Sequence, residues 1–201
     1  MSLANKITIL RILLVPIFAV AVFLSRQGVV FVLAALVIFI CVGVSDFLDG
    51  YFARRRNEKT RLGMMLDPLA DKLTMVTAVI LLGTDFWPEF TRLMPWTVIS
   101  IVSGDVLIIA GALILREIRK NVIDLPPIAS GKFNTASQLV LIPFVLFFQF
   151  LRDAVPADVS LEGLQICLKV MQWWVIAWVI ISFTGYVRKA VIILTALPSH
   201  E

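Results

Sequence analysis

Six long apolar stretches restrict how this chain can fold more than any other feature of its sequence. They cover residues 7–24, 29–46, 66–82, 96–115, 136–151 and 170–187. A helix needs about 20 mostly apolar residues to cross the hydrocarbon of a bilayer, and each stretch approaches that length. Hydrophobic residues make up 60% of the 201 positions, which is more than a soluble domain of this size can bury. The sequence therefore predicts a polytopic integral membrane protein.

The expected fold is all-α, with six transmembrane helices in one domain over residues 1–201. Lipid offers no water to backbone amides, so a spanning segment must satisfy its own hydrogen bonds, as a helix does. The stretches also lack the short alternating pattern of a transmembrane β-barrel. No internal repeat with a period of 20 to 50 residues is present.

Lysine and arginine gather in alternate connections, which predicts the orientation of the helices. The connections after the second and fourth stretches are the basic ones, and the opposite connections hold only Arg26, Arg92, Arg152 and Lys169. Because an excess of basic residues marks the cytoplasmic side, both termini are expected there. Trp87, Trp96, Trp173 and Trp174 then fall near the outer surface, which aromatic side chains favour.

Two pairs of aspartates stand beside the connection that follows the second stretch. Asp46 and Asp49 are three residues apart, and Asp67 and Asp71 are four apart, so each pair shares a helix face. If the connection folds back, four carboxylates converge at the cytoplasmic membrane surface. Four negative charges in one place repel one another, so a cation is expected between them, and oxygen ligands favour Mg²⁺ or Mn²⁺. Zinc is not expected, because His200 is the only histidine.

A plainer interpretation is that these carboxylates form interfacial ion pairs with Arg54, Arg55, Arg56 and Lys72. Small residues weigh against it. Gly50 and Ala53 share the face of Asp46 and Asp49, and Gly63 lies four residues before Asp67. Small side chains there leave room for a ligand to approach the backbone or for close helix packing.

The pattern Asp46-x-x-Asp49-Gly50-x-x-Ala53-Arg54, eight residues, Gly63-x-x-x-Asp67-x-x-x-Asp71 resembles the signature of the CDP-alcohol phosphotransferase family at all eight positions. The resemblance implies a membrane enzyme that transfers a phosphatidyl group from CDP-diacylglycerol to an alcohol and releases CMP. It implies two divalent ions held by Asp46, Asp49 and Asp67, with Asp71 as general base beside them in the metal cluster. The nucleotide would contact Thr8, Asp49, Gly50, Ala53, Arg54 and Gly63.

Two further segments resemble the phosphatidylglycerophosphate synthase branch of that family. They are Asn5-x-x-Thr8-x-x-Arg11 and the segment 130–138, which reads SGKFNTASQ and resembles that branch's loop before the fifth span. The resemblance assigns acceptor binding to Asn5, Arg11, Lys132 and Arg116. The alternatives are an ordinary helix start with Arg11 extending to the membrane surface, and a capped helix with an inside-positive lysine.

The fourth stretch departs from that branch. Glycerophosphate enzymes commonly carry Arg-Glu where this chain has Gly104-Asp105, and the cardiolipin synthases of the family carry Arg-Asp. Glycerol 3-phosphate is the acceptor we expect, with phosphatidylglycerol, and hence cardiolipin synthesis, as the alternative. Asp105 is interpreted either as the partner of an acceptor-side cation or as a structural carboxylate.

Two other classes of protein compete with a transferase. A divalent-cation transporter would place carboxylates near the bilayer midplane, where only Asp105 lies, and a membrane scaffold would leave the eight-position pattern unexplained. We expect a bacterial inner-membrane enzyme with a cytoplasmic active site, a homodimer by analogy with the family, and no nucleic-acid partner. Cys41 and Cys167 are expected to be free thiols.

Overall fold

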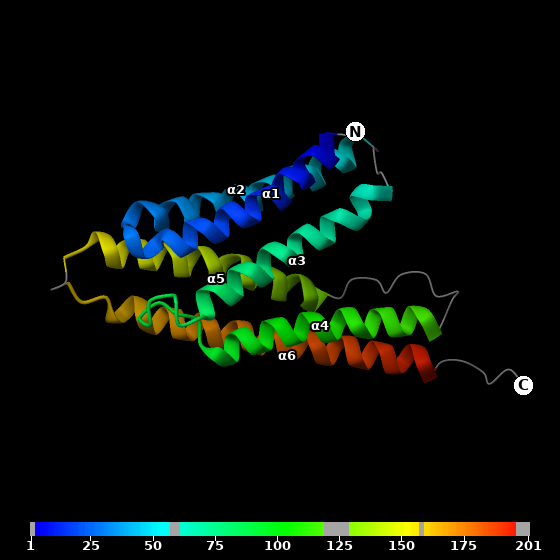
Figure 1. Cartoon of the computed structure of the whole chain (residues 1–201). Coiled ribbons are helices and arrows are strands. Elements are labelled where there is room, and N and C mark those ends of the chain that lie inside the picture. The colour runs from blue at the N-terminus through cyan, green and yellow to red at the C-terminus, as the bar shows by residue number, and fades with distance from the viewer. Residues whose placement is uncertain (1–2, 57–60, 119–128, 157–158, 196–201) are drawn as a thin grey trace, which may run out of the picture.

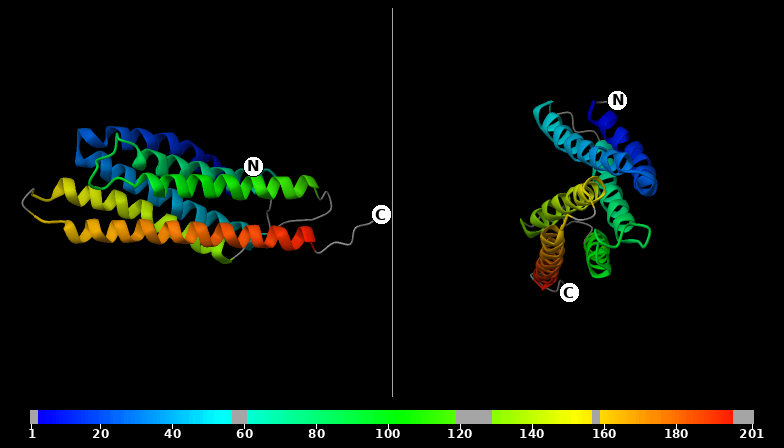
Figure 2. Two further views of the ribbon diagram at one scale, coloured as in Figure 1. Left: turned by 90° about the horizontal axis from the view of Figure 1, so that it is seen from below. Right: turned by 90° about the vertical axis from the view of Figure 1, so that its left-hand side faces the viewer.

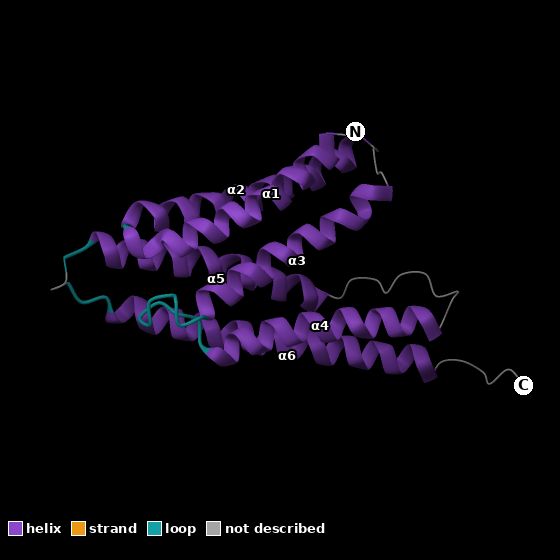
Figure 3. Ribbon diagram, viewed as in Figure 1, coloured by secondary structure: helices purple, strands orange, loops and turns teal. Residues whose placement is uncertain are grey.

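The computed structural model describes residues 3–56, 61–118, 129–156 and 159–195, and it gives the backbone alone for 3–8, 46–56, 61–69, 112–113, 115–118, 129 and 193–194. Within these ranges the chain is helical apart from short connections (Figure 3). The helices are α1 (Leu3–Leu24), the 3-10 turn η1 (Ser25–Gln27), α2 (Val29–Arg56), α3 (Arg61–Gly83), α4 (Pro95–Ile118), α5 (Ala129–Ala154) and α6 (Glu162–Thr195).

The all-α prediction is confirmed, and each expected stretch lies within a different helix. The helices are longer than the stretches because hydropathy marks the apolar core of a span, whereas a helix continues until its hydrogen bonds are interrupted. Arg54, Arg55 and Arg56 therefore extend α2, where the sequence predicted a loop. The segment 130–135 belongs to the first turns of α5 and is not a loop before it.

Three helical segments are long and apolar enough to cross a bilayer by length and composition: Ile9–Gln27, Ser130–Ala154 and Glu162–Ile192. Two shorter apolar segments, Val29–Ser45 and Pro95–Gly111, accompany them in the described part of the chain. Large apolar side chains on the outside of the bundle, such as Leu13, Val106 and Trp173, are more than half exposed. Exposed apolar surface on this scale suits lipid rather than water. Six complete crossings remain a prediction.

The helices pack in a closed ring in which each contacts two neighbours. The order around the ring is α1, α2, α5, α6, α4, α3 and back to α1, with a further contact between α3 and α5 across it. Seen end-on, α1 and α2 lie on one side, α4 and α6 on the other, and α3 and α5 between them (Figure 2). Helices α2, α3, α4 and α5 therefore each turn one face towards the inside of the ring.

Successive helices run in opposite directions, so the two termini lie at the same end of the bundle (Figure 1). The end of α2 and the start of α3, which carry the aspartates, are at that end as well. This agrees with the expectation that both termini and the aspartates share one side of the membrane. Which side is cytoplasmic remains a prediction from the charges.

Polar contacts hold the opposite end together. Arg26 donates from Nε to the carbonyl of Phe86 at 2.8 Å and from Nη2 to that of Asp85 at 3.1 Å, which ties η1 to the α3–α4 connection. Trp87 is 1% exposed and donates to Thr91 Oγ1, which donates in turn to Gln149 of α5. Trp87 is therefore buried in this connection, whereas Trp96, Trp173 and Trp174 are exposed.

Candidate active site

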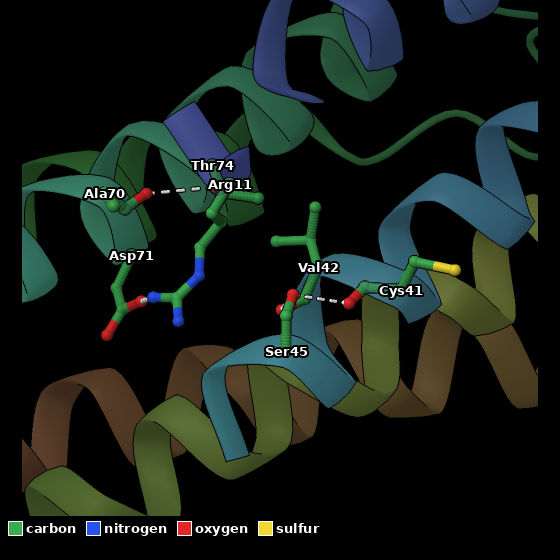
Figure 4. A network of polar contacts seen from close by, with 7 residues as sticks. All are labelled: Arg11, Cys41, Val42, Ser45, Ala70, Asp71 and Thr74. Atoms are coloured by element: carbon green, nitrogen blue, oxygen red, sulfur yellow. Dashed lines mark hydrogen bonds and ion pairs between the residues drawn. The ribbon is translucent and has the colours of Figure 1, made fainter. Parts of the chain in front are cut away.

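Asp71 lies on the inner side of α3 and meets an arginine from α1. Arg11 donates from Nη1 to Asp71 Oδ1 at 2.5 Å, across 60 residues of sequence (Figure 4). The Arg11 side chain is 1% exposed and that of Asp71 is 46% exposed. A charge-assisted bond of this kind fixes the carboxylate in place while leaving the rest of it accessible. The alternative in which Arg11 extends to the membrane surface is wrong, because the side chain is buried.

The local fold explains why Asp71 points inward. Ala70, one residue earlier, is fully buried, and Thr74, one turn later, is 5% exposed and donates to the Ala70 carbonyl at 2.9 Å (Figure 4). Since residues three and four apart share a helix face, Asp71 stands beside Met75 and next to the packed side of α3. Ala70 is small, and the Thr74 hydroxyl is bonded within its own helix, so α1 can approach closely enough for Arg11 to reach Asp71.

Asp71 opens onto a cavity of about 510 Å³ between α2, α3, α4 and α5. Most of its wall is apolar, and its polar side chains are Asp71, Lys72, Thr74, Thr135 and Gln138. We call it the aspartate cavity. A mostly apolar pocket with a few converging polar groups is the usual form of a ligand site.

A second cavity of about 510 Å³ adjoins the first, and Lys72, Ile109, Thr135 and Leu139 line both. Its polar wall comes from four helices: Lys72, Asp105, Lys132, Asn134, Ser182 and Tyr186. We call it the hydroxyl cavity. Gln138, in the first wall, donates to Asn134, in the second, at 3.2 Å.

An ion pair stands where the two cavities meet. Lys72 Nζ lies 2.5 Å from Asp105 Oδ1, and the Asp105 side chain is only 6% exposed while that of Lys72 is 40% exposed. Asp105 therefore pairs with Lys72, the residue after Asp71, and its two interpretations, acceptor-side partner and structural carboxylate, both remain predictions. The sequence suggested that Lys72 pairs with the aspartates of the motif. In the structure it pairs with Asp105 of α4 instead.

Gly104, beside Asp105, explains the departure from the arginine pattern. A Cβ atom at this position would lie 2.7 Å from Val179 Cγ1 of α6, closer than real side chains approach. The absence of a side chain therefore lets α4 and α6 pack together there. A long side chain at position 104 would have no room in this packing.

The sequence matches the family model for CDP-alcohol phosphatidyltransferase over residues 1–184. The chain belongs to this family.

Among proteins of known name, it is similar to three that are called CDP-diacylglycerol--glycerol-3-phosphate 3-phosphatidyltransferase. The protein from Haemophilus influenzae is 33% identical, over 70% of this chain and 73% of the relative. The protein from Bacillus subtilis is 31% identical, over 72% of this chain and 76% of the relative. The protein from Escherichia coli K12 is 30% identical, over 73% of this chain and 77% of the relative. The chain is thus a member of a family of phospholipid-synthesising transferases with membrane helices, and the transporter and scaffold hypotheses are set aside.

The remaining motif residues of this CDP-alcohol phosphatidyltransferase are placed only by their backbone. Asp46, Asp49, Gly50, Ala53 and Arg54 lie in the last turns of α2, and Gly63 and Asp67 in the first turns of α3. Their side chains fall outside the described residues, so their convergence around two ions remains a prediction. Helix α1 packs against both α2 and α3 and so links the two halves of the motif.

The donor set nevertheless fits a hard divalent ion. Asp71 presents a half-exposed carboxylate to the aspartate cavity, and the other three aspartates are carried to the same end of the bundle. Among the side chains that the structure describes, no three acidic, histidine or cysteine groups come together. Oxygen donors without sulfur or imidazole suit Mg²⁺ or Mn²⁺.

The structure describes the side chains of two of the four predicted acceptor residues. Lys132 is exposed and lines the hydroxyl cavity, whereas Arg11 contacts Asp71. Asn5 lies in α1 and Arg116 in α4, with side chains outside the described residues, as is that of Thr8 in α1, which the resemblance assigns to the nucleotide. Only Lys132 is therefore placed at a cavity that an acceptor could enter.

Sequence reasoning missed Ser182 and Tyr186 of α6, which line the hydroxyl cavity. A signal was present, because these polar residues are four apart at the end of a long apolar stretch and so share a helix face. Nothing in their spacing indicated which helix they would meet. Cys41 and Cys167 are free thiols in the structure, and both are exposed.

Proposed function

We propose that this protein transfers the phosphatidyl group of CDP-diacylglycerol to glycerol 3-phosphate, giving phosphatidylglycerophosphate and CMP. The observation that carries the proposal is the buried Arg11, which holds the half-exposed Asp71 at the wall of a cavity that continues into a second, polar one. The names of the similar proteins support glycerol 3-phosphate as the acceptor.

In this proposal Asp71 is the general base. The acceptor hydroxyl gives its proton to the Asp71 carboxylate as its oxygen bonds to the phosphorus that carries diacylglycerol. The bond from that phosphorus to the oxygen shared with CMP breaks, and CMP leaves with that oxygen. Arg11 fixes the direction of the Asp71 carboxylate, which matters because in-line transfer depends on the placement of the attacking atom.

Asp46, Asp49 and Asp67, with Asp71 beside them, would hold two divalent ions. Bound there, Mg²⁺ or Mn²⁺ would neutralise the pyrophosphate and stabilise the attacking and leaving oxygens. Thr8, Gly50, Ala53, Arg54 and Gly63 would form the nucleotide pocket, where small residues let the ligand approach the backbone.

Lys132 is proposed to bind the phosphate of the acceptor as a mobile point charge. Asn5, Arg11 and Arg116 are the other acceptor residues that the resemblance suggests. The alternative acceptor is phosphatidylglycerol, favoured by Asp105, since the cardiolipin synthases carry Asp where the glycerophosphate enzymes carry Glu, and by the largely apolar wall of the aspartate cavity.

An acceptor panel tests this function. Purified protein in nanodiscs is given labelled CDP-diacylglycerol, Mg²⁺ or Mn²⁺, and glycerol 3-phosphate, phosphatidylglycerol, inositol or serine, and CMP and lipid products are measured. We expect CMP release with glycerol 3-phosphate, its loss on chelation with EDTA, and its loss in Asp71→Asn. Lys132→Gln should raise the KM for glycerol 3-phosphate about tenfold. Release with phosphatidylglycerol alone would establish the alternative, and release with neither would refute both.

A further inference from the structure

The hydroxyl cavity contains two buried polar atoms that lack a hydrogen-bond partner among the residues the structure describes. They are Oδ2 of Asp105, whose Oδ1 contacts Lys72, and Oγ of Ser182, a residue that is fully buried. Buried polar groups are nearly always hydrogen-bonded, and leaving one unpaired is costly. Two such groups on one cavity wall indicate a ligand that supplies the missing bonds.

Ser182 is buried where α5 packs closely against α6. Gly131 of α5 packs against α6 at this point, and a Cβ there would lie 3.0 Å from the Tyr186 hydroxyl and 3.7 Å from Ser182 Oγ. A Cβ at 131 would press on the Tyr186 hydroxyl and make an ordinary contact with Ser182 Oγ. Glycine thus leaves room beside both hydroxyls.

The chemistry of the wall favours a hydroxyl over a phosphate at this position. A carboxylate oxygen can only accept a hydrogen bond, and it repels an anion, whereas a hydroxyl ligand can donate to Asp105 and accept from Ser182. The cations that could meet a phosphate, Lys72 and the exposed Lys132, also line the cavity. Asp105 draws Lys72 towards α4.

We propose that Asp105 and Ser182 bind a second hydroxyl of the acceptor, next to the one that attacks, and thereby select a polyol headgroup. The inference rests on the proposed function, since the attacking hydroxyl would lie at Asp71 in the adjoining aspartate cavity. Both residues determine specificity, because they contact a part of the acceptor that does not react. The ligand group is the middle hydroxyl of a glycerol unit, present in both glycerol 3-phosphate and phosphatidylglycerol.

The test pairs each acceptor with an analogue that lacks only that hydroxyl. Glycerol 3-phosphate is compared with 3-hydroxypropyl phosphate, and phosphatidylglycerol with phosphatidyl-1,3-propanediol. Binding is measured by calorimetry and turnover by CMP release, for the wild type and Ser182→Ala. A site that hydrogen-bonds a hydroxyl discriminates against analogues without it. In the wild type we therefore expect the affinities of at least one acceptor and its analogue to differ about tenfold or more. Ser182→Ala should reduce this affinity ratio about fivefold, because it weakens the binding of only the compound that carries the hydroxyl.

Two further variants strengthen the test. Thr184→Ala removes a hydroxyl from the same helix, one that bonds to the carbonyls of Ile180 and Ile181 and is exposed, and it should leave the ratio unchanged. Asp105→Asn keeps the shape of the side chain and should also reduce the ratio. Ser182→Ala removes an atom with no partner in the described residues, so its thermal stability should match that of the wild type.

The binding ratios decide the inference independently of the reaction. Equal binding within both pairs, or a ratio that Ser182→Ala leaves intact, would overturn it. Discriminating binding without CMP release would refute the proposed function while supporting the hydroxyl subsite.

Discussion

At the scale of single residues, Arg11 and Asp71 form the contact on which the proposed site depends. A guanidinium that is 1% exposed has lost its hydration, and its bond to a carboxylate offsets part of that loss. Because Asp71 remains 46% exposed, its charge is partly screened, so the pair does more to fix geometry than to stabilise the fold.

Arg11→Met is therefore expected to lower kcat about 100-fold, because Asp71 loses the group that fixes it, with little change in the KM for CDP-diacylglycerol. CMP release in nanodiscs measures both constants. The control is Arg26→Met, which breaks contacts at the opposite end of the bundle and should retain kcat. If Arg11→Met raised the acceptor KM and left kcat unchanged, Arg11 would bind the acceptor instead.

At the scale of helices, close packing of α4 on α6 depends on Gly104. The packing matters for the site because Asp105 and Ser182 come from these two helices and meet the same cavity. Small residues permit such close approach in membranes, where dispersion contacts replace the hydrophobic effect between helices.

Gly104→Ala should destabilise the protein by about 1–3 kcal/mol, because its Cβ would overlap Val179 in a packed region. Fluorescence-detected size exclusion after heating in detergent measures the loss as a lower apparent Tm. Adding Val179→Ala should recover part of it by removing the methyl groups that clash. Gly111→Ala, two turns further along α4, is the matched control, since no described atom lies within 4 Å of the added Cβ. Equal effects of the two alanines would contradict this account.

At the scale of the whole molecule, both cavities lie between helices of the ring, and alternation of direction brings the start of α1, the end of α6 and the aspartates to one end. The distribution of lysine and arginine predicts that this end is cytoplasmic. A lipid substrate with a nucleotide headgroup suits a site at that boundary.

Cysteine labelling tests the orientation. In a background with Cys41 and Cys167 replaced by alanine, Glu89→Cys, at an exposed position of the α3–α4 connection, should react with an impermeant maleimide in intact cells. His200→Cys should react only after lysis, because the C-terminus is expected inside. The reverse pattern would show that the orientation is inverted and that the site faces outward.

Much of the fold could be predicted from the sequence because helix formation in lipid is a local requirement. The apolar stretches marked every helix, and the spacing of the aspartates marked Asp71 as part of a site. The Arg11–Asp71 and Lys72–Asp105 pairs could not be predicted, since each joins residues on different helices and no spacing rule relates them. Ser182 was missed for the same reason.

The sequence by itself determined that the chain is an all-α membrane protein, which family it belongs to, and which aspartates carry the motif. These properties depend on the order and type of neighbouring residues, and lipid enforces them segment by segment. Only the tertiary structure decided that α3 lies between α1 and α4 in the ring, so that Asp71 faces an arginine and Lys72 faces a buried carboxylate. Helix order in a bundle follows from side-chain packing between distant segments, and that packing placed the two cavities side by side.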